Sequence, residues 1–249
     1  MRIIDLHCYP NTEPWIKSQG PYVEALAKYW NRSWTAKTEE AVIEEFKQAG
    51  VEAVLVAFDI ETVTGAPPCS NAYVAQMRDQ NPGVILQAWA AVDPLKGDAA
   101  ITEAKKAINE LKVLVMIDVG TTGMGAGMPG GLGAVIRHAH PSAIDQLAAD
   151  FPNLNIVAAH PGWPWTDEMI AVALHKGNVS WELSGWAPKY FPDAVKRELK
   201  GRLKDKIMFG SDYPSIPYDR LFREWNELGY SDELREKIFH ANAERILGL

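Results

Sequence analysis

The chain begins with MRIIDLHCY (residues 1–9), a short run rich in isoleucine and leucine that ends at a histidine and a tyrosine. Six more apolar runs follow, separated by stretches with helical periodicity, and strands that alternate with helices in this way pair in parallel. The predicted strands cover residues 2–8, 51–58, 84–92, 112–119, 154–160, 178–183 and 206–211. No linker or fixed-period repeat interrupts them, so residues 1–249 are predicted to form a single α/β domain.

Helix boundaries are recognisable between these strands. Thr38 and Thr166 each precede two acidic residues and an apolar periodic stretch, a pattern typical of capped helix N-termini. Gly50 and Gly177 are predicted to stop these two helices. Asp98 is predicted to begin a third helix and Ser231 the last one. The inward face of the Asp98 helix is expected to carry Ile101, Ala104, Ala107, Ile108 and Leu111.

The composition is typical of a globular protein, since 47% of the 249 residues are hydrophobic and 23% are charged. A chain of this length buries roughly 70–75% of the surface that its unfolded form exposes, so it needs no disulfide or metal to remain folded. Any bound metal is therefore expected to serve chemistry. The net charge of −7 repels phosphate groups, which argues against nucleic acid and anionic lipid as partners.

The expected location of the protein is the cytoplasm. The apolar run at the start of the chain is too short for a signal peptide, and no stretch reaches the roughly 20 apolar residues of a membrane span. The two cysteines, Cys8 and Cys69, form no CxxC pair, which fits a compartment where thiols remain reduced.

Polar side chains collect at the ends of the predicted strands. They are His7, Tyr9, Asp118, His160, Glu182 and Asp212. In a closed parallel barrel all strands open at their carboxyl ends on one face, so these side chains would converge although the sequence scatters them. In an open sheet the first and last strands lie far apart, and nothing would bring His7 near Asp212. The pattern therefore favours a closed barrel.

Residues 120–133, GTTGMGAGMPGGLG, contain seven glycines and are predicted to form a loop over a site. Residues 125–130 match the pattern G-x-G-x-x-G. However, Pro129 and the delay after the preceding strand do not fit the tight strand–turn–helix of a dinucleotide site. A flexible loop beside a ligand is the favoured interpretation.

Three motifs carry a resemblance to a known family: IDLHCY (residues 4–9), AAHPG (158–162) and FGSDYP (209–214). They resemble signatures of the amidohydrolase superfamily, specifically the amidohydrolase-2 (amidohydrolase-related) branch. That branch includes aminocarboxymuconate semialdehyde and γ-resorcylate decarboxylases besides hydrolases. The resemblance extends over most of the chain, through residues 92–94, 149–152, 183–192 and 242–249.

The resemblance implies a distorted TIM barrel with a divalent metal, usually zinc, held by an HxH pair, a later histidine and the aspartate of the last strand. His7 and Asp212 match this ligand pattern, and His160 matches the histidine that moves protons beside the metal, while Asp212 doubles as a base. Two positions depart from it, because Tyr9 replaces the second histidine of HxH and Asp118 replaces another.

His7, Asp118 and Asp212 together offer one imidazole and two carboxylates, which is a sufficient set for an open zinc or manganese site. The alternative is a barrel that retained its shape and lost its ion. One strand and helix of the branch are also missing between Asp98 and Val119. The barrel then closes with seven units, or an eighth strand is formed near residues 134–136.

Aromatic side chains near the strand ends are expected to bind the substrate, with simple packing as the alternative interpretation. They are Tyr9, Trp163, Trp165 and Trp186, and Trp15 follows the first strand. Lys189 and Arg137 are candidates to meet a carboxylate, or else surface charges.

The predicted function is that of a metal-dependent hydrolase acting on a small aromatic or unsaturated carboxylic compound, with His160 and Asp212 as the catalytic residues. Three alternatives stay open. They are a non-oxidative decarboxylase of an aromatic acid, a catalytically impaired barrel that only binds small molecules, and a metal-free lyase that uses only His160 and Asp212 for proton transfer. Family likeness makes a homodimer plausible.

Overall fold

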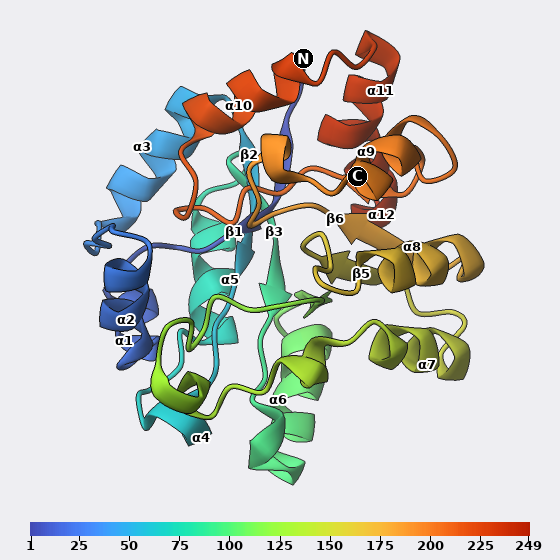
Figure 1. Ribbon diagram of the computed structural model, residues 1–249. Helices are drawn as coiled ribbons and strands as arrows, with labels where there is room; N and C mark the ends of the chain where they lie inside the picture. Colours follow the sequence, from blue (N-terminus) through green and yellow to red (C-terminus); the bar gives the residue numbers. More distant parts are fainter.

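The computed structural model describes all residues from 1 to 249, and its centre is a sheet of seven parallel strands (Figure 1). The strands are β1 (Ile4–Cys8), β2 (Glu52–Val56), β3 (Ile85–Ala90), β4 (Leu114–Asp118), β5 (Ile156–Ala159), β6 (Val179–Glu182) and β7 (Ile207–Met208). Each strand pairs in parallel with the next one along the chain. All seven predicted strands are therefore confirmed.

The sheet closes on itself at a seam between β1 and the segment that begins with β7. The amide of Leu6 donates to the carbonyl of Phe209 at 3.2 Å, and the amide of Tyr9 donates to the carbonyl of Tyr213 at 2.9 Å. Cys8 and Tyr213 form a parallel bridge at the same place. This closure confirms the distorted TIM barrel and excludes an open sheet.

Helices surround the strands on the outside of the ring (Figure 1). They are α1 (Glu13–Ser18), α2 (Tyr22–Tyr29), α3 (Glu39–Ala49), α4 (Glu61–Thr64), α5 (Asn71–Gln80), α6 (Asp98–Asn109), α7 (Ser142–Asp150), α8 (Thr166–His175), α9 (Asp193–Lys200), α10 (Tyr218–Glu227), α11 (Asp232–Glu236) and α12 (Asn242–Leu247). Short 3₁₀ turns cover Pro94–Lys96, Pro129–Gly133, Ile136–Ala139 and Pro188–Tyr190, and Lys237–Ala241 is a π-helical turn. None of the helices is both long and apolar enough to cross a bilayer.

Most predicted helix boundaries have the expected cause. The Thr38 hydroxyl accepts the Ala41 amide at 3.2 Å, and Gly50 ends α3 in the left-handed conformation with φ 67°. Asp98 and Ser231 begin their helices as predicted. Thr166 is different, because its hydroxyl donates to the Pro161 carbonyl instead of capping the helix. That helix ends at His175, before Gly177.

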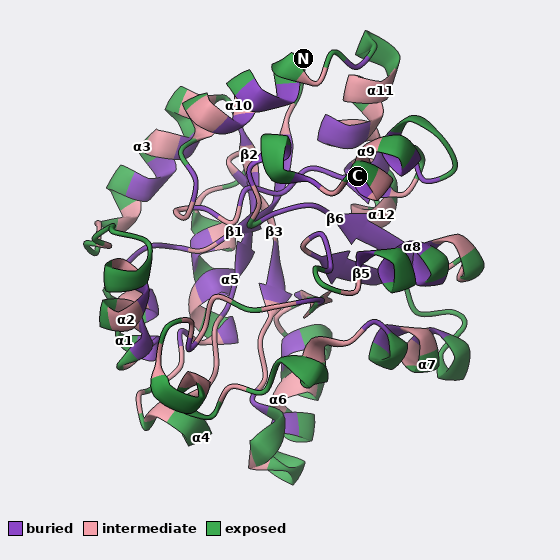
Figure 2. Cartoon of the chain, viewed as in Figure 1, coloured by how far each residue is buried: buried purple, intermediate pink, exposed green.

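The predicted inward face of α6 is only partly correct. Ala100 and Ala107 are buried, whereas Ile101 and Ile108 are 55% and 46% exposed. Figure 2 accordingly shows much of α6 as exposed surface. The barrel has no eighth strand near residues 134–136, and the outer face of β4 is also poorly covered, since Val115 is 40% exposed. The missing strand and helix thus leave apolar side chains of α6 and β4 without a neighbour.

The barrel interior is filled with side chains from most of the strands. A cluster that includes Ile4, Leu6, Trp89, Val157 and Met208 occupies it. The Trp89 indole donates to the Leu6 carbonyl at 2.6 Å, so its buried N–H is satisfied. This packed floor leaves room for a site only at the carboxyl ends of the strands.

Candidate active site

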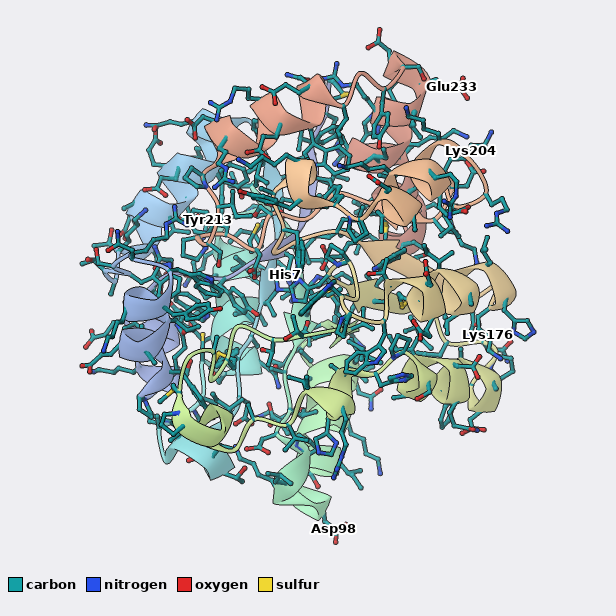
Figure 3. All side chains as sticks on the ribbon, viewed as in Figure 1. His7, Asp98, Lys176, Lys204, Tyr213 and Glu233 are labelled. Carbon is teal, nitrogen blue, oxygen red and sulfur yellow. The ribbon has the colours of Figure 1, made fainter.

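Four of the predicted site residues meet at the carboxyl ends of the strands, and His7 lies in the middle of the molecule (Figure 3). His7 comes from β1, Asp118 ends β4, His160 follows β5 and Asp212 follows β7. The Nε2 atom of His7 lies 3.5 Å from Asp212 Oδ1, and His160 Nε2 lies 3.6 Å from Asp118 Oδ1. The two imidazole rings are 5.1 Å apart between centroids. The ring of strands therefore brings together residues from both ends of the sequence.

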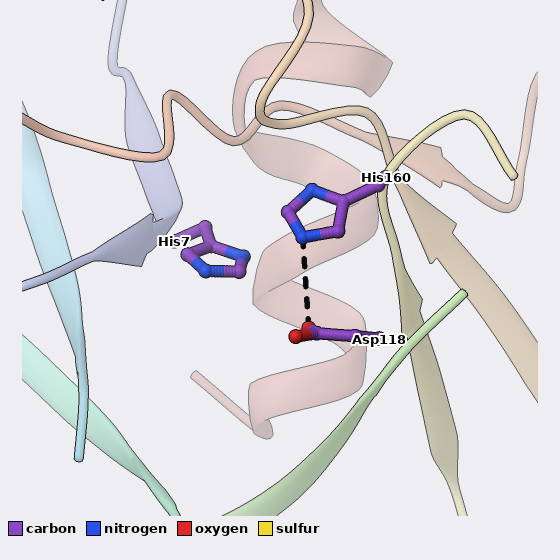
Figure 4. Close-up of side chains that lie close together, drawn as sticks. All are labelled: His7, Asp118 and His160. Atoms are coloured by element: carbon purple, nitrogen blue, oxygen red, sulfur yellow. Dashed lines mark ion pairs between the residues drawn. The ribbon is translucent and has the colours of Figure 1, made fainter. Parts of the chain in front are cut away.

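Three of these residues form one compact group. The candidate ligand atoms of His7, Asp118 and His160 all lie within 4.8 Å of one another (Figure 4). Asp212 borders the group through His7. His160, for which only a proton-transfer role was predicted, thus stands as close to the group as the expected ligands do.

His7 is oriented by a buried carboxylate. Its Nδ1 atom hydrogen-bonds Glu182 Oε1 at 2.9 Å, and both side chains are fully buried. With the Nδ1 proton donated to Glu182, the Nε2 atom points toward Asp212 and has no hydrogen-bond partner. Burial lowers the pKa of His7, but the hydrogen bond to Glu182 and its charge outweigh this effect and raise that pKa to about 9. A cation at Nε2 has to displace a proton from this atom.

Glu182 was noted at a strand end in the sequence, but its role was not predicted. Burial raises the pKa of Glu182, but the charge of His7 and the hydrogen bond to it lower that pKa. The net pKa lies below its usual value, so the carboxylate stays ionised. It also accepts the Ser184 amide at 2.7 Å and the Ser184 hydroxyl at 2.9 Å. A Cβ atom at Gly210 would collide with Glu182 Oε2, so glycine at this position makes room for the carboxylate.

Asp5 is a second functional residue that the sequence analysis did not identify. Its Oδ1 atom accepts the His7 amide at 3.1 Å and the Ser211 amide at 2.9 Å, and its Oδ2 atom accepts the Tyr218 hydroxyl at 2.7 Å. The buried carboxylate therefore joins β1 to the segment that carries Asp212. The only sequence signal for this role was a charged residue within an apolar strand.

His160 and Asp212 have an unusual backbone. Their φ angles are 72° and 61°, in the left-handed region that residues with a side chain rarely adopt. Such strain persists where the surrounding structure enforces it, and it is concentrated at functional sites. The His160 Nδ1 atom is held by the Ser184 carbonyl at 3.1 Å and the Ser184 hydroxyl at 2.9 Å. These contacts direct His160 Nε2 toward Asp118.

Asp212 is electrostatically suited to accept a proton. Burial raises the pKa of its carboxyl group above the usual value. His7 and His160 lower that pKa, whereas the charges of Asp118 and Glu182 raise it further. The result is a carboxylate that is a stronger base than an exposed aspartate.

The group fits a divalent cation. His7 Nε2 is a buried nitrogen without a protein partner, and its other nitrogen is bound to a carboxylate, as is usual for metal-ligating histidines. Two carboxylates lie near this nitrogen: Asp212 Oδ1 at 3.5 Å, and Asp118 in the group whose candidate ligand atoms lie within 4.8 Å of one another. One nitrogen and two carboxylates make an open site that zinc or manganese accepts.

A pocket of about 480 Å³ opens beside this group. Its lining includes the predicted residues Tyr9, Trp163 and Trp186, together with Asp118, His160 and Asp212. Trp165 lies outside the lining, and its ring packs edge-on against His140 at 4.9 Å. Lys189 and Arg137 also lie outside it, so no lysine or arginine faces the ligand space.

The far wall of the pocket is formed by α1, α2 and the glycine-rich loop. Leu26, Tyr29 and Trp30 line it from α2 and the residue that follows, and residues 120–124 line it from the loop. The Tyr22 hydroxyl donates to the Leu132 carbonyl at 2.8 Å, which joins α2 to the loop. A Cβ atom at Gly123 would collide with the Trp30 ring. The loop thus lies beside the ligand space, as its glycines predicted.

Comparisons with known proteins agree with this fold. A family model described as amidohydrolase matches residues 106–249, and no curated protein sequence matches the chain. A TIM-barrel protein from Bordetella bronchiseptica is 21% identical with a TM-score of 0.74, covering 100% of this chain and 99% of that one.

Two further solved structures have the same fold. An amidohydrolase from Burkholderia multivorans with bound zinc is 12% identical with a TM-score of 0.67, and the alignment covers 100% of both chains. A dihydroxybenzoic acid decarboxylase from Polaromonas sp., with bound manganese and the inhibitor 2-nitroresorcinol, is 16% identical with a TM-score of 0.65. That alignment covers 100% of this chain and 97% of the other.

Proposed function

The chain belongs to the amidohydrolase family, and on that premise we propose that it is a metal-dependent hydrolase acting on a small aromatic or unsaturated carboxylic compound. One observation carries the proposal. His7 has a buried Nε2 atom without a protein partner, and this atom lies among Asp118, His160 and Asp212 beside an aromatic pocket. Such a nitrogen is a ready ligand, and the pocket gives a flat substrate access to it.

His7, Asp118 and Asp212 are the residues that would hold the cation. The bound zinc and manganese of the two relatives described above support a divalent ion in this family. When bound, such an ion lowers the pKa of coordinated water and polarises a carbonyl oxygen.

The protein's own groups move the protons. Asp212, with its raised pKa, takes a proton from the attacking water. The Nδ1–H of His160 is donated to Ser184, so Nε2 is the atom free to carry a proton. It first takes up a proton, which makes the ring an imidazolium, and then delivers that proton to the leaving group. Burial raises the pKa of Tyr9 well above its usual value, so its hydroxyl stays protonated and can donate to an oxygen that gains charge.

Non-oxidative decarboxylation is the second candidate, favoured by the structural likeness to the dihydroxybenzoic acid decarboxylase. In that reaction the same groups would bind the oxygens of an aromatic acid, and His160 or Asp212 would protonate the ring carbon that loses carbon dioxide. The two reactions release different products, which makes them separable by experiment.

The test uses protein that is freed of metal with a chelator and reloaded with zinc or manganese. Aromatic esters, lactones and dihydroxybenzoates are supplied, and acid release and carbon dioxide are both measured. We expect metal-dependent acid release without carbon dioxide, and a loss of roughly 100-fold or more in Asp212→Asn. Carbon dioxide release would establish the decarboxylase instead. Ligand binding that is insensitive to chelator, without any turnover, would establish a non-catalytic barrel.

A cytoplasmic location and a homodimeric state, both expected from the sequence, stay predictions. Light scattering on the purified protein measures the oligomeric state directly. A monomer at working concentration would contradict it.

A further inference from the structure

Two buried N–H groups on the far wall of the pocket have no acceptor in the protein. Trp15 lies in α1 and Gln19 follows it by one helical turn; both side chains line the pocket, and they are only 5% and 3% exposed. The indole Nε1 of Trp15 and the amide Nε2 of Gln19 make no hydrogen bond. Asn11 Oδ1, a buried acceptor earlier in the same segment, also makes no hydrogen bond.

The two most deeply buried tryptophans of this protein, Trp89 and Trp181, are satisfied. Trp89 donates to the Leu6 carbonyl and Trp181 donates to the His160 carbonyl, both at 2.6 Å. Buried donors without an acceptor are rare in folded proteins, and each such group calls for an explanation. Two of them on one face of a ligand pocket indicate an acceptor that the ligand supplies.

The position of the two donors relates them to the candidate cation group. The centroid of the Tyr9 ring lies 5.2 Å from that of the His7 ring. The Tyr9 ring also stacks on the Trp15 ring, with 5.2 Å between the two centroids. One aromatic ring therefore separates Trp15 from His7. A ligand that lies along Tyr9 with its reacting bond near His7 would reach Trp15 with its opposite end.

The charge of the pocket restricts the kind of acceptor group that a ligand can present to Trp15 and Gln19. No lysine or arginine lines the pocket, while Asp118 and Asp212 do. A second free carboxylate at the Trp15 end would be buried without a countercharge, which is costly. Neutral oxygen acceptors, such as a ring carbonyl, hydroxyl or methoxy group, match two neutral N–H donors.

We propose that Trp15 and Gln19 form a subsite that recognises an uncharged oxygen acceptor on an aromatic ligand, one ring length from the reacting bond. The position of that bond rests on the function proposed above, whereas the binding preference does not. The proposal narrows the substrate class to aromatic compounds with a neutral oxygen substituent at the end remote from the cation group.

The test compares two probes of nearly the same shape. Acetophenone carries a carbonyl oxygen, and α-methylstyrene carries a methylene group in its place. Binding is measured by titration with metal-loaded and with chelator-treated protein, and the tryptophan indole N–H signals are followed by ¹H–¹⁵N NMR, with Trp15→Phe assigning the Trp15 signal. We expect acetophenone to bind about tenfold more tightly in both preparations and to move the Trp15 indole proton downfield.

Two variants and a control make the result specific. Gln19→Met and Trp15→Phe each introduce an apolar side chain of similar reach that lacks the N–H donor. Both variants should bring the ratio of the two probes' affinities close to one. The control Trp186→Phe alters another aromatic residue of the lining and should weaken both probes alike. An unmoved Trp15 signal with acetophenone bound, an unchanged ratio in the two variants, or no binding of acetophenone would each overturn the subsite.

The outcome also separates this proposal from the proposed function. Turnover of aromatic esters without the acetophenone preference rejects the subsite and leaves the hydrolase intact. The preference without turnover of any substrate rejects the hydrolase and leaves the subsite intact.

Discussion

Asp5 fastens the first strand to the segment carrying Asp212. Three buried donors, from His7, Ser211 and Tyr218, end on its carboxylate. Replacing Asp5 by alanine leaves all three without an acceptor, so we expect the free energy of unfolding to fall by about 3 kcal/mol or more. Urea unfolding measures this. Asp79→Ala at an exposed position is the control, with an expected change within about 0.5 kcal/mol. Equal losses in the two variants would contradict the role of Asp5.

The two cysteines are expected to be inert in the folded protein. Burial raises the pKa of the Cys69 thiol to about 12 and that of the Cys8 thiol well above its usual value. Since only the thiolate reacts, a raised pKa keeps both groups protonated and unreactive up to about pH 8 and beyond. A colorimetric thiol reagent should therefore detect no thiol in native protein and both thiols after unfolding in guanidinium chloride. Rapid reaction of one thiol without denaturant would show that the protein opens there.

The principal site residues were predictable from the sequence because they obey one local rule. His7, Asp118, His160 and Asp212 each stand at the end of an apolar strand, and a closed parallel barrel places all such positions on one face. Glu182 obeys the same rule, but its role depends on the room left by Gly210, which the sequence does not show. The unpaired N–H groups of Trp15 and Gln19 were equally invisible, since hydrogen-bond partners are defined only by the fold.

At the scale of elements, α6 shows why periodicity alone can choose the wrong face. Ala100 and Ala107 are seven positions apart, as are Ile101 and Ile108, so both pairs fit a helical stripe. Hydrophobicity placed both isoleucines on the inward face together with Ala107. The structure does bury Ala107, but it buries Ala100 with it and leaves the isoleucines exposed. The larger side chains face a side of the barrel where no further helix follows.

This arrangement makes opposite predictions for neighbouring positions of α6. Ile101→Lys places a charge at a 55% exposed position and should change the free energy of unfolding by less than about 0.5 kcal/mol. Ala107→Lys forces a long charged side chain into a fully buried position and should cost several kcal/mol. Thermal and urea unfolding of the two variants give the comparison. A larger loss in Ile101→Lys than in Ala107→Lys would contradict the exposure of Ile101 and the burial of Ala107.

Gly120 is one of the glycines on which the loop after β4 depends. Gly120 has φ 92°, and a Cβ atom there would lie 2.6 Å from the backbone of Gly162. Gly120→Ala should therefore destabilise the protein by about 2 kcal/mol or more, through backbone strain and collision with a second backbone. Gly177→Ala is the matched control, because nothing lies within 4 Å of its Cβ position and its φ is ordinary. A stability loss of the same size in both variants would argue against the close approach.

For the molecule as a whole, the sequence predicted the barrel architecture better than the number of strands with which the barrel closes. Seven alternating strand and helix patterns were sufficient to predict a parallel barrel. The number of strands was left open, because residues 134–136 have the composition of a short strand but form the approach to a 3₁₀ turn. The backbone hydrogen bonds across the seam, among them those from Leu6 and Tyr9, show that seven strands are sufficient.

A cation held by His7, Asp118 and Asp212 would connect the first, the fourth and the last strand segments. Binding to the folded state alone should raise stability by about 2.7 kcal/mol at a metal concentration 100-fold above Kd. In a domain of this size that corresponds to an increase in Tm of roughly 5–10 °C. Thermal unfolding with zinc or manganese and with chelator measures it, and His7→Ala should remove the increase. An unchanged Tm at saturating zinc and manganese would contradict a cation site.

The seam also determines how late in folding the candidate site can be assembled. Asp5 and Ser211, which are hydrogen-bonded across it, stand 206 positions apart in the chain. A ribosome therefore synthesises the imidazole of His7 long before the carboxylate that will face it, and the intervening strands must assemble as an unclosed ring. Contacts of such long range form late and slowly, since the entropy of closing a long loop opposes them. A nascent chain that lacks its final segment can be largely helical and compact and still contain no catalytic centre.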